Sequence, residues 1–272
     1  MLSIIGITPH PPIIIPAIGR DNLGKAQKTV DGMKQLSNMI RREEPELLIV
    51  ITPHGKIARE GPAVMTHERL KGDFGRFGHP QVEIEMQSDA QLIDLLVEEA
   101  SSEPVKPALL GDSDRGIRAD ADLDHGAMVP IYYLKEAGID IPGVHITIGF
   151  QSYETLYLFG KILRRAVDRR GAPAAVIASG DLSHRLTPDA PAGYNPGGIE
   201  FDRQLVEYLK EGRVEDILNF DQRLVEEAGE CGLRSFIIAL GMLDGKGFKP
   251  EIISYEGPFG VGYLVAALHP GR

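Results

Sequence analysis

The sequence contains one cysteine, Cys231, and no tryptophan. A single cysteine cannot form a disulfide within the chain, so a disulfide scaffold is excluded and a reducing compartment is compatible with the sequence. Long apolar runs are missing too, because none approaches the roughly 18 residues that a membrane-spanning helix needs. The apolar run at 2–7 has no basic segment before it and is broken by Pro9, Pro11 and Pro12. We therefore expect no signal peptide, no membrane anchor and a cytoplasmic location.

Positive charge is also scarce. The chain has 29 Lys and Arg against 39 Asp and Glu, which gives a formal net charge of −10. This balance argues against sequence-independent binding of nucleic acid, which requires a basic face. With 43% hydrophobic and 25% charged residues, the composition is that of an ordinary soluble globule that can bury a sizeable core. No shift in composition divides the 272 residues, so we predict one domain over 1–272.

Short apolar runs rich in β-branched residues alternate with amphipathic stretches along the chain. Several runs are apolar throughout, as expected for strands buried on both faces of a parallel sheet. The alternation predicts a three-layer α/β domain, with a mostly parallel central sheet flanked by helices. The expected strands are 3–7, 47–51, 63–66, 108–110, 144–148, 174–178, 249–254 and 262–268. The expected helices are 21–42, 88–100, 127–137, 153–169, 199–210, 214–218 and 233–243.

Two segments are predicted to be loops. Residues 71–80 are rich in glycine and charge, and residues 187–198 contain three prolines and three glycines. The second segment follows a candidate catalytic motif, so it could act as a lid.

The most informative feature is a repeated pattern, an apolar strand that ends in Thr-Pro-His. The first copy ends at His10 and the second at His54. Proline cannot donate to a sheet ladder, so each strand must stop there and leave its histidine beyond the carboxyl end. Ligands of open α/β sheets bind at that edge, where two such imidazoles could reach one cation. Each histidine could instead only cap a loop, but the repetition favours metal binding by both.

Two further histidines are placed in a similar way. His184 ends the segment Ser-Gly-Asp-Leu-Ser-His after the strand 174–178, and His125 precedes a helix within Asp-His-Gly. The nearby Asp181 and Asp124 could orient these rings or raise their basicity. Asp124 could instead only cap the helix that follows. Structural or surface roles are assigned to the other four histidines, His67, His79, His145 and His269.

A third ligand would complete a metal site. Glu230 and Cys231 precede the apolar helix at 233–243, whose positive N-terminus favours an anionic side chain. A carboxylate beside two histidines makes the facial triad of non-haem Fe(II) oxygenases, whereas a thiolate favours Zn(II) or Cu. Glu230 is the first choice and Glu256, which follows a strand near the C-terminus, is the second. Glu230 could also be only a helix-terminal charge.

Taken in order, these motifs resemble the LigB-type class III extradiol ring-cleavage dioxygenase superfamily. The resemblance covers nearly the whole chain, from His-Pro-Pro at 10–12 and Thr-Pro-His at 52–54 through Asp-His-Gly at 124–126 and Ser-Gly-Asp-Leu-Ser-His at 179–184 to Gly-Glu-Cys-Gly at 229–232. The phrase Ser-Tyr-Glu-Gly-Pro-Phe-Gly-Val-Gly-Tyr at 254–263 is similar to the AmmeMemoRadiSam and Memo-like branch.

The resemblance implies that His10 and His54 are metal ligands, that His184 is the catalytic acid/base and that His125 faces the substrate. Ring-cleaving members carry glutamate before the last apolar helix and Memo proteins carry cysteine, whereas this chain carries both, Glu230 and Cys231. Fe(II) is the expected metal, with Zn(II) or Cu as alternatives.

The implied function is extradiol cleavage of a catecholic or related aromatic substrate with O₂, in aromatic compound metabolism. A homo-oligomer or a partner subunit is implied by resemblance alone. The alternatives are a Memo-like metal-binding protein without ring cleavage and a zinc-dependent hydrolase. No HExxH helix or hydrolase nucleophile motif supports the hydrolase.

Overall fold

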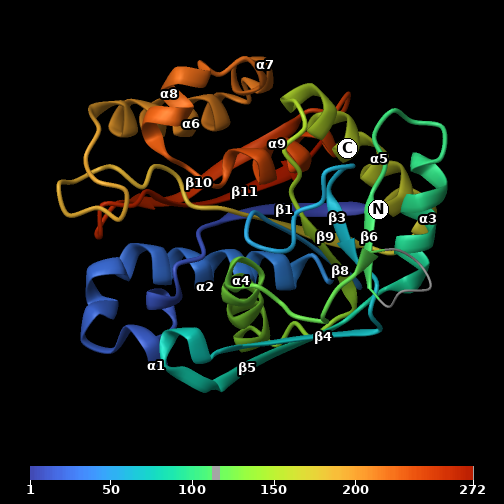
Figure 1. Ribbon diagram of the computed structural model, residues 1–272, viewed down its shortest axis with the longest axis horizontal. Coiled ribbons are helices and arrows are strands. Elements are labelled where there is room, and N and C mark those ends of the chain that lie inside the picture. Colours follow the sequence, from blue (N-terminus) through green and yellow to red (C-terminus); the bar gives the residue numbers. More distant parts are fainter. Residues whose placement is uncertain (112–116, 272) are drawn as a thin grey trace.

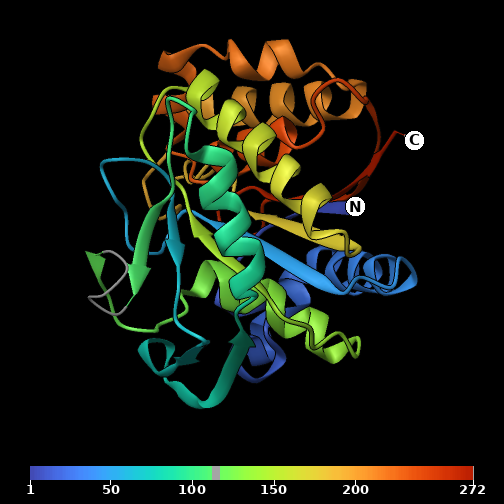
Figure 2. The ribbon, with the colours of Figure 1, turned by 90° about the vertical axis from the view of Figure 1, so that its right-hand side faces the viewer.

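The computed structural model describes residues 1–111 and 117–271. This part of the chain folds into a nine-stranded central sheet with helices on both faces, and the layers are visible in two perpendicular views (Figures 1 and 2). The predicted three-layer α/β architecture with a mostly parallel central sheet is confirmed.

The central sheet contains both parallel and antiparallel pairs. Its strands are β1 (Leu2–Thr8), β2 (Leu47–Thr52), β3 (Ala63–Met65), β6 (Ala108–Gly111), β7 (Ile117–Arg118), β8 (Gly143–Thr147), β9 (Ala174–Ser179), β10 (Phe248–Glu256) and β11 (Tyr263–Pro270). They lie in the order β10-β11-β1-β9-β2-β8-β3-β6-β7. The four central strands β1, β9, β2 and β8 are parallel, whereas β11 pairs antiparallel with β1 and with β10, and β3 pairs antiparallel with β8. The sheet is therefore mostly, but not wholly, parallel.

Helices cover both faces of this sheet. They are α1 (Pro16–Gly19), α2 (Gln27–Arg42), α3 (Ala90–Ala100), α4 (His125–Glu136), α5 (Tyr153–Arg170), α6 (Pro196–Glu211), α7 (Val214–Leu218), α8 (Gln222–Ala228) and α9 (Leu233–Gly241). In Figure 1, α5, α6 and α9 lie above the sheet, and α2 and α4 lie below it. Among the described residues, no helix is long and apolar enough to cross a membrane.

The central strands are apolar throughout because both of their faces are buried. Along β1, Ile5 and Ile7 belong to one hydrophobic core while Ile4 belongs to the core on the opposite face. Side chains alternate between the faces of a strand, so each core receives every second residue. This arrangement explains why uninterrupted apolar runs marked the strands correctly.

Every predicted strand and helix is present, with shifted ends, but the prediction of a loop at 71–80 was wrong. That segment belongs to a hairpin of β4 (Arg69–Phe74) and β5 (His79–Gln87), joined by the short 3₁₀ helix η3 (Gly75–Phe77). Leu70 and Phe74 are buried while the charged residues between them are exposed, so the charges masked a period-two pattern. The helix α8 was also missed.

Candidate metal centre

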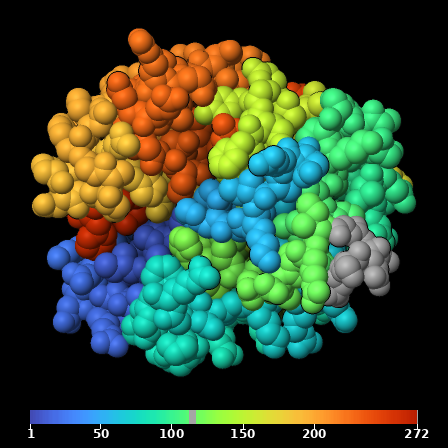
Figure 3. All heavy atoms as spheres, in the orientation of Figure 1, coloured from blue at the N-terminus to red at the C-terminus, as the bar shows by residue number. Residues whose placement is uncertain are grey.

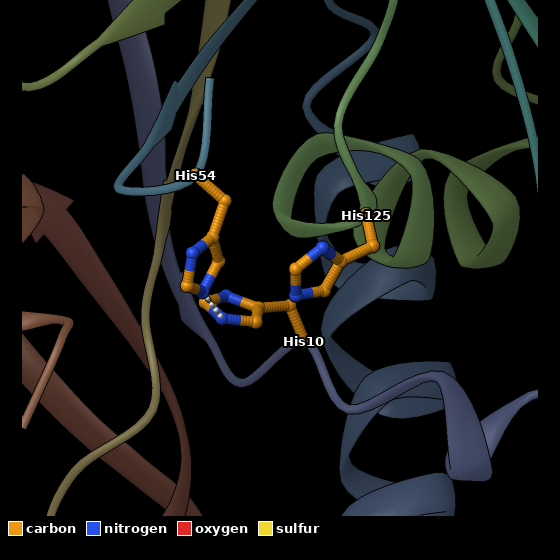
Figure 4. A group of neighbouring side chains, drawn as sticks. All are labelled: His10, His54 and His125. Carbon is orange, nitrogen blue, oxygen red and sulfur yellow. Dashed lines mark hydrogen bonds between the residues drawn. The ribbon is translucent and has the colours of Figure 1, made fainter. Parts of the chain in front are cut away.

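Three imidazoles converge at the carboxyl edge of the central sheet. His10 follows β1, His54 follows β2, and His125 is the first residue of α4 (Figure 4). The Nε2 atoms of His10 and His54 are 2.9 Å apart, and the ring of His54 stacks on that of His125 at a centroid distance of 4.4 Å. Each residue offers one ligand atom, and these atoms all lie within 4.8 Å of one another.

This geometry suits a metal ion. Two nitrogens bound to one ion at roughly 2.0–2.1 Å and at right angles lie roughly 2.9 Å apart. Burial and the neighbouring His54 lower the pKa of His10, and burial and His125 lower that of His54. Burial and His10 lower the pKa of His125 to about 4. All three rings are therefore neutral near pH 7, which is the form that binds metal.

A hydrogen-bond chain fixes the tautomer of the buried His10. The Ser179 hydroxyl, at the end of β9, donates to the Gly126 carbonyl at 2.5 Å, so it must accept from Nδ1 of His10 at 2.9 Å. The lone pair of His10 is then on Nε2, the atom that faces His54. A metal-binding histidine typically donates its other ring nitrogen in this way.

Asp124 connects the segments that carry His54 and His125. Its Oδ1 accepts from Thr52 Oγ1 at 2.7 Å and caps α4 by accepting from the Ala127 amide at 3.3 Å. The Thr52 hydroxyl in turn accepts from the His54 amide at 3.2 Å. Asp124 thus serves as the helix cap that the sequence left open, and no described hydrogen bond joins it to the His125 ring.

The second oxygen of Asp124 contacts a histidine that sequence reasoning had set aside. Nε2 of His145, on β8, lies 2.9 Å from Asp124 Oδ2. Although burial raises the pKa of Asp124, hydrogen bonds from His145 and Thr52 hold it far below its usual range. One feature of the sequence indicated such a contact, because His145 is a polar residue within the strand predicted at 144–148, and every residue of β8 is buried.

His184 lies outside the cluster of three histidines. Its amide donates to Ala228 O at 3.1 Å, and Nδ1 of its ring is buried with no hydrogen-bond partner in the part of the chain that the structure describes. Burial lowers the pKa of His10 and raises that of Asp181, and His184 has a smaller effect that lowers both. No described hydrogen bond joins Asp181 to the His184 ring, and Asp181 Oδ1 accepts instead from the His10 amide at 2.9 Å.

Of the two adjacent candidates before α9, the cysteine contacts one of the histidines. Cys231 Sγ is 3.7 Å from His10 Nε2, and burial, followed by the nearby Asp181, raises the pKa of its thiol. The Glu230 carboxylate instead accepts from the Leu233 amide at 2.6 Å and so caps α9. Burial raises the pKa of Glu230 to about 7.

Glu256, the second choice for a carboxylate ligand, faces another helix. Its Oε1 accepts from the amide and the hydroxyl of Thr29 at 2.7 and 2.6 Å, at the first turn of α2. Neither glutamate belongs to the group of described residues that could hold a metal, whose third member is His125.

A cavity of about 560 Å³ opens beside the histidines, which is within the usual range for small-molecule sites. His54, His125 and His145 form part of its wall, and the tip of the β4–β5 hairpin forms another part. There the ring of Phe77 approaches that of His125 edge-on at 5.6 Å. Figure 3 shows this hairpin on the same face as the segment that follows β2. The remaining lining is mixed, with Met65, Leu123 and Met128 beside Lys56, Arg76, Asp73, Asp120 and Asp122.

Comparison with known proteins settles the family. Residues 5–266 match the model of the LigB family, described as the catalytic LigB subunit of aromatic ring-opening dioxygenase. The chain belongs to the LigB family. The expected LigB-type resemblance is thereby confirmed over nearly the whole length.

Individual relatives of this LigB protein cover most of the chain. It is 39% identical over 264 residues to Protein CA_C1420 of Clostridium acetobutylicum, a match that covers 96% of this chain but only 56% of that protein. It is 24% identical over 255 residues to 3,4-dihydroxyphenylacetate 2,3-dioxygenase of Escherichia coli, covering 87% and 88% of the two chains. The crystal structure of the uncharacterized protein JW3007 from Escherichia coli K12 has the same fold, with a TM-score of 0.65 and 18% identity over 97% of this chain and 99% of that one.

Proposed function

We propose that this LigB protein is an Fe(II)-dependent dioxygenase of the extradiol type, which opens the ring of a catecholic compound with O₂ beside its two hydroxyls. The observation that carries the proposal is the convergence of His10, His54 and His125 at one edge of the sheet, where the first two can hold an ion and the third lines the cavity beside them. Similarity to 3,4-dihydroxyphenylacetate 2,3-dioxygenase over 87% of this chain supports the same reaction class. The cytoplasmic location and a homo-oligomer or partner subunit stay predictions from the sequence.

In this proposal His10 and His54 hold the ion through their Nε2 atoms, and Ser179 keeps His10 in the required tautomer. When bound, Fe(II) supplies Lewis acidity and open coordination positions for the substrate and O₂. His125 faces the cavity, where it can hydrogen-bond the substrate.

His184 is the proposed acid/base, because its Nδ1 has no other partner among the described residues and is free to exchange a proton. It accepts the proton of a substrate hydroxyl and later returns it to the product. His184 does not line the cavity. The role therefore requires a substrate hydroxyl to reach His184 beyond the residues that line the cavity.

The third ligand separates this function from a second candidate. A dioxygenase of this type would use Glu230, whose carboxylate must first release the Leu233 amide. A Memo-like metal-binding protein without ring cleavage would use Cys231. Bonds of roughly 2.3 Å to sulfur and 2.0–2.1 Å to nitrogen at a tetrahedral angle place the two atoms roughly 3.6 Å apart. The observed 3.7 Å between Cys231 Sγ and His10 Nε2 is close to this value and supports the second candidate, whereas the 2.9 Å between the Nε2 atoms of His10 and His54 fits a right angle and not a tetrahedral one.

Anaerobic loading with Fe(II), Zn(II) or Cu, followed by elemental analysis and O₂ uptake on a panel of catechols, tests the proposal. One equivalent of iron with catechol-dependent O₂ uptake supports the dioxygenase. Stoichiometric zinc or copper with no O₂ uptake by any loaded form supports the Memo-like protein. The surface variant His269→Ala serves as the control for nonspecific binding by histidine.

A further inference from the structure

We propose that His145 is a positioning residue, which acts through Asp124 and Thr52 to hold His54 and His125 in place and so sets the affinity of the metal centre. The inference rests on the proposed metal centre. It assigns a role to a residue that contributes no atom to the cluster of three histidines.

His145 is buried, so its single described hydrogen bond is needed to offset the cost of removing a polar ring from water. The side chain is 1% exposed, on a strand whose other residues are apolar, small or hydroxyl-bearing. A buried polar ring costs free energy unless it is hydrogen-bonded. Nε2 binds Asp124 Oδ2 at 2.9 Å, and Nδ1 has no hydrogen-bond partner in the described part of the chain. Among the described residues, the His145 ring therefore forms a hydrogen bond with Asp124 alone.

Asp124 also forms hydrogen bonds with two separate segments, the end of β2 and the start of α4. Its other oxygen receives the Thr52 hydroxyl and the Ala127 amide, which fixes the end of β2 and the start of α4 at one carboxylate. The Thr52 hydroxyl also accepts from the His54 amide. His54 follows the first of these segments and His125 begins the second, so the relative position of the two rings depends on this carboxylate.

Close packing restricts the network at two glycines. A Cβ atom on Gly126 would lie 2.3 Å from Thr52 Oγ1 and 2.9 Å from Asp124 Oδ1. A Cβ atom on Gly55 would lie 2.0 Å from Thr147 Oγ1 and 3.2 Å from the His145 ring. Backbone therefore packs closely against the network at Gly126 and Gly55, so no side chain can enter from these two directions, while Asp124 and His145 also border the cavity.

The test compares His145→Leu with His145→Gln by measuring the dissociation constant for Zn(II) in competition with a chelator. Leucine removes the donor to Asp124, and removal of such an outer partner typically weakens metal binding by about 10–100-fold. The glutamine amide can replace the Nε2 donor, so His145→Gln should recover most of the affinity. Thr147→Val is the matched control, because Thr147 is buried on the same face of β8 and its hydroxyl has no described partner. It should bind Zn(II) as the wild type does.

Equal affinity of His145→Leu and the wild type would overturn the proposal, as would equal losses in the leucine and glutamine variants. Should His145→Leu not fold, Thr52→Val breaks the same network at its link to His54, and unchanged Zn(II) binding by that variant would also overturn it. Crystal structures of the metal-free variants give an independent result, because displacement of the His54 and His125 rings is expected in His145→Leu and not in His145→Gln. If the wild type binds no metal, the proposed function fails while this comparison still decides the positioning role.

Discussion

Asp202 is a buried carboxylic acid that accepts a hydrogen bond from the residue before His184. Its replacement by asparagine tests how the burial of this group makes the stability of the protein depend on pH. Asp202 is 1% exposed. Its Oδ1 accepts from the Ser183 amide at 2.8 Å and its Oδ2 from the Tyr255 hydroxyl at 2.6 Å. Burial raises its pKa from the ordinary 3.8 to about 7, although both hydrogen bonds act in the opposite direction.

The sign of the pH dependence follows from this shift. Below about pH 4 the carboxyl group is protonated in both the folded and the unfolded protein, and its contribution to stability is complete. Between about pH 4 and 7 only the folded protein keeps the proton, so the free energy of unfolding falls as the pH rises. Each tenfold change in proton affinity corresponds to about 1.4 kcal/mol, so the loss at pH 8 is about 4 kcal/mol.

Asp202→Asn removes this titration while its amide oxygen still accepts from Ser183. The free energy of unfolding of the variant minus that of the wild type should therefore rise by about 4 kcal/mol between pH 4 and pH 8. Urea unfolding followed by circular dichroism at one-unit pH intervals measures the difference. As a control, Asp189→Asn changes an exposed carboxylate in the loop before α6 and should give a difference near zero throughout. A difference for Asp202→Asn that is constant over this range would refute the reasoning.

The remaining predictions concern the candidate ligands and the acid/base. Glu230→Ala should weaken Fe(II) binding more than Cys231→Ser does if the centre is of dioxygenase type, and the reverse order of dissociation constants would indicate the Memo-like site. His184→Phe should keep the metal and bind substrate but lose about 10²–10⁴-fold in turnover. An unchanged rate would remove His184 from the mechanism.

The sequence predicted the sheet well because burial on both faces makes a strand apolar at every position. It missed β4 and β5, where the solvent-facing charges hide Leu70 and Phe74. A strand with one solvent-exposed face alternates apolar and polar residues, so its hydrophobic pattern is weaker than that of a strand buried on both faces. A glycine within it weakens the pattern further.

The convergence of His10 and His54 could be predicted from the sequence because the strand, its breaking proline and the histidine are adjacent in the chain. The role proposed for His145 could not, since its contact with Asp124 depends on how β8 packs against the start of α4. The direction of the Glu230 side chain was equally hidden. A carboxylate at that position can cap its own helix, as Glu230 does, and residue spacing alone does not distinguish this from a ligand.

The most direct test of the account is the metal content of purified protein after anaerobic loading, compared among the wild type, His10→Ala, His54→Ala and the control His269→Ala. We expect about one equivalent of Fe(II) in the wild type and the control, and almost none in the two strand-end variants. Their far-UV circular dichroism should be unchanged, because neither His10 nor His54 belongs to a helix or a strand. Undiminished metal in both His10→Ala and His54→Ala would contradict the assignment of this centre.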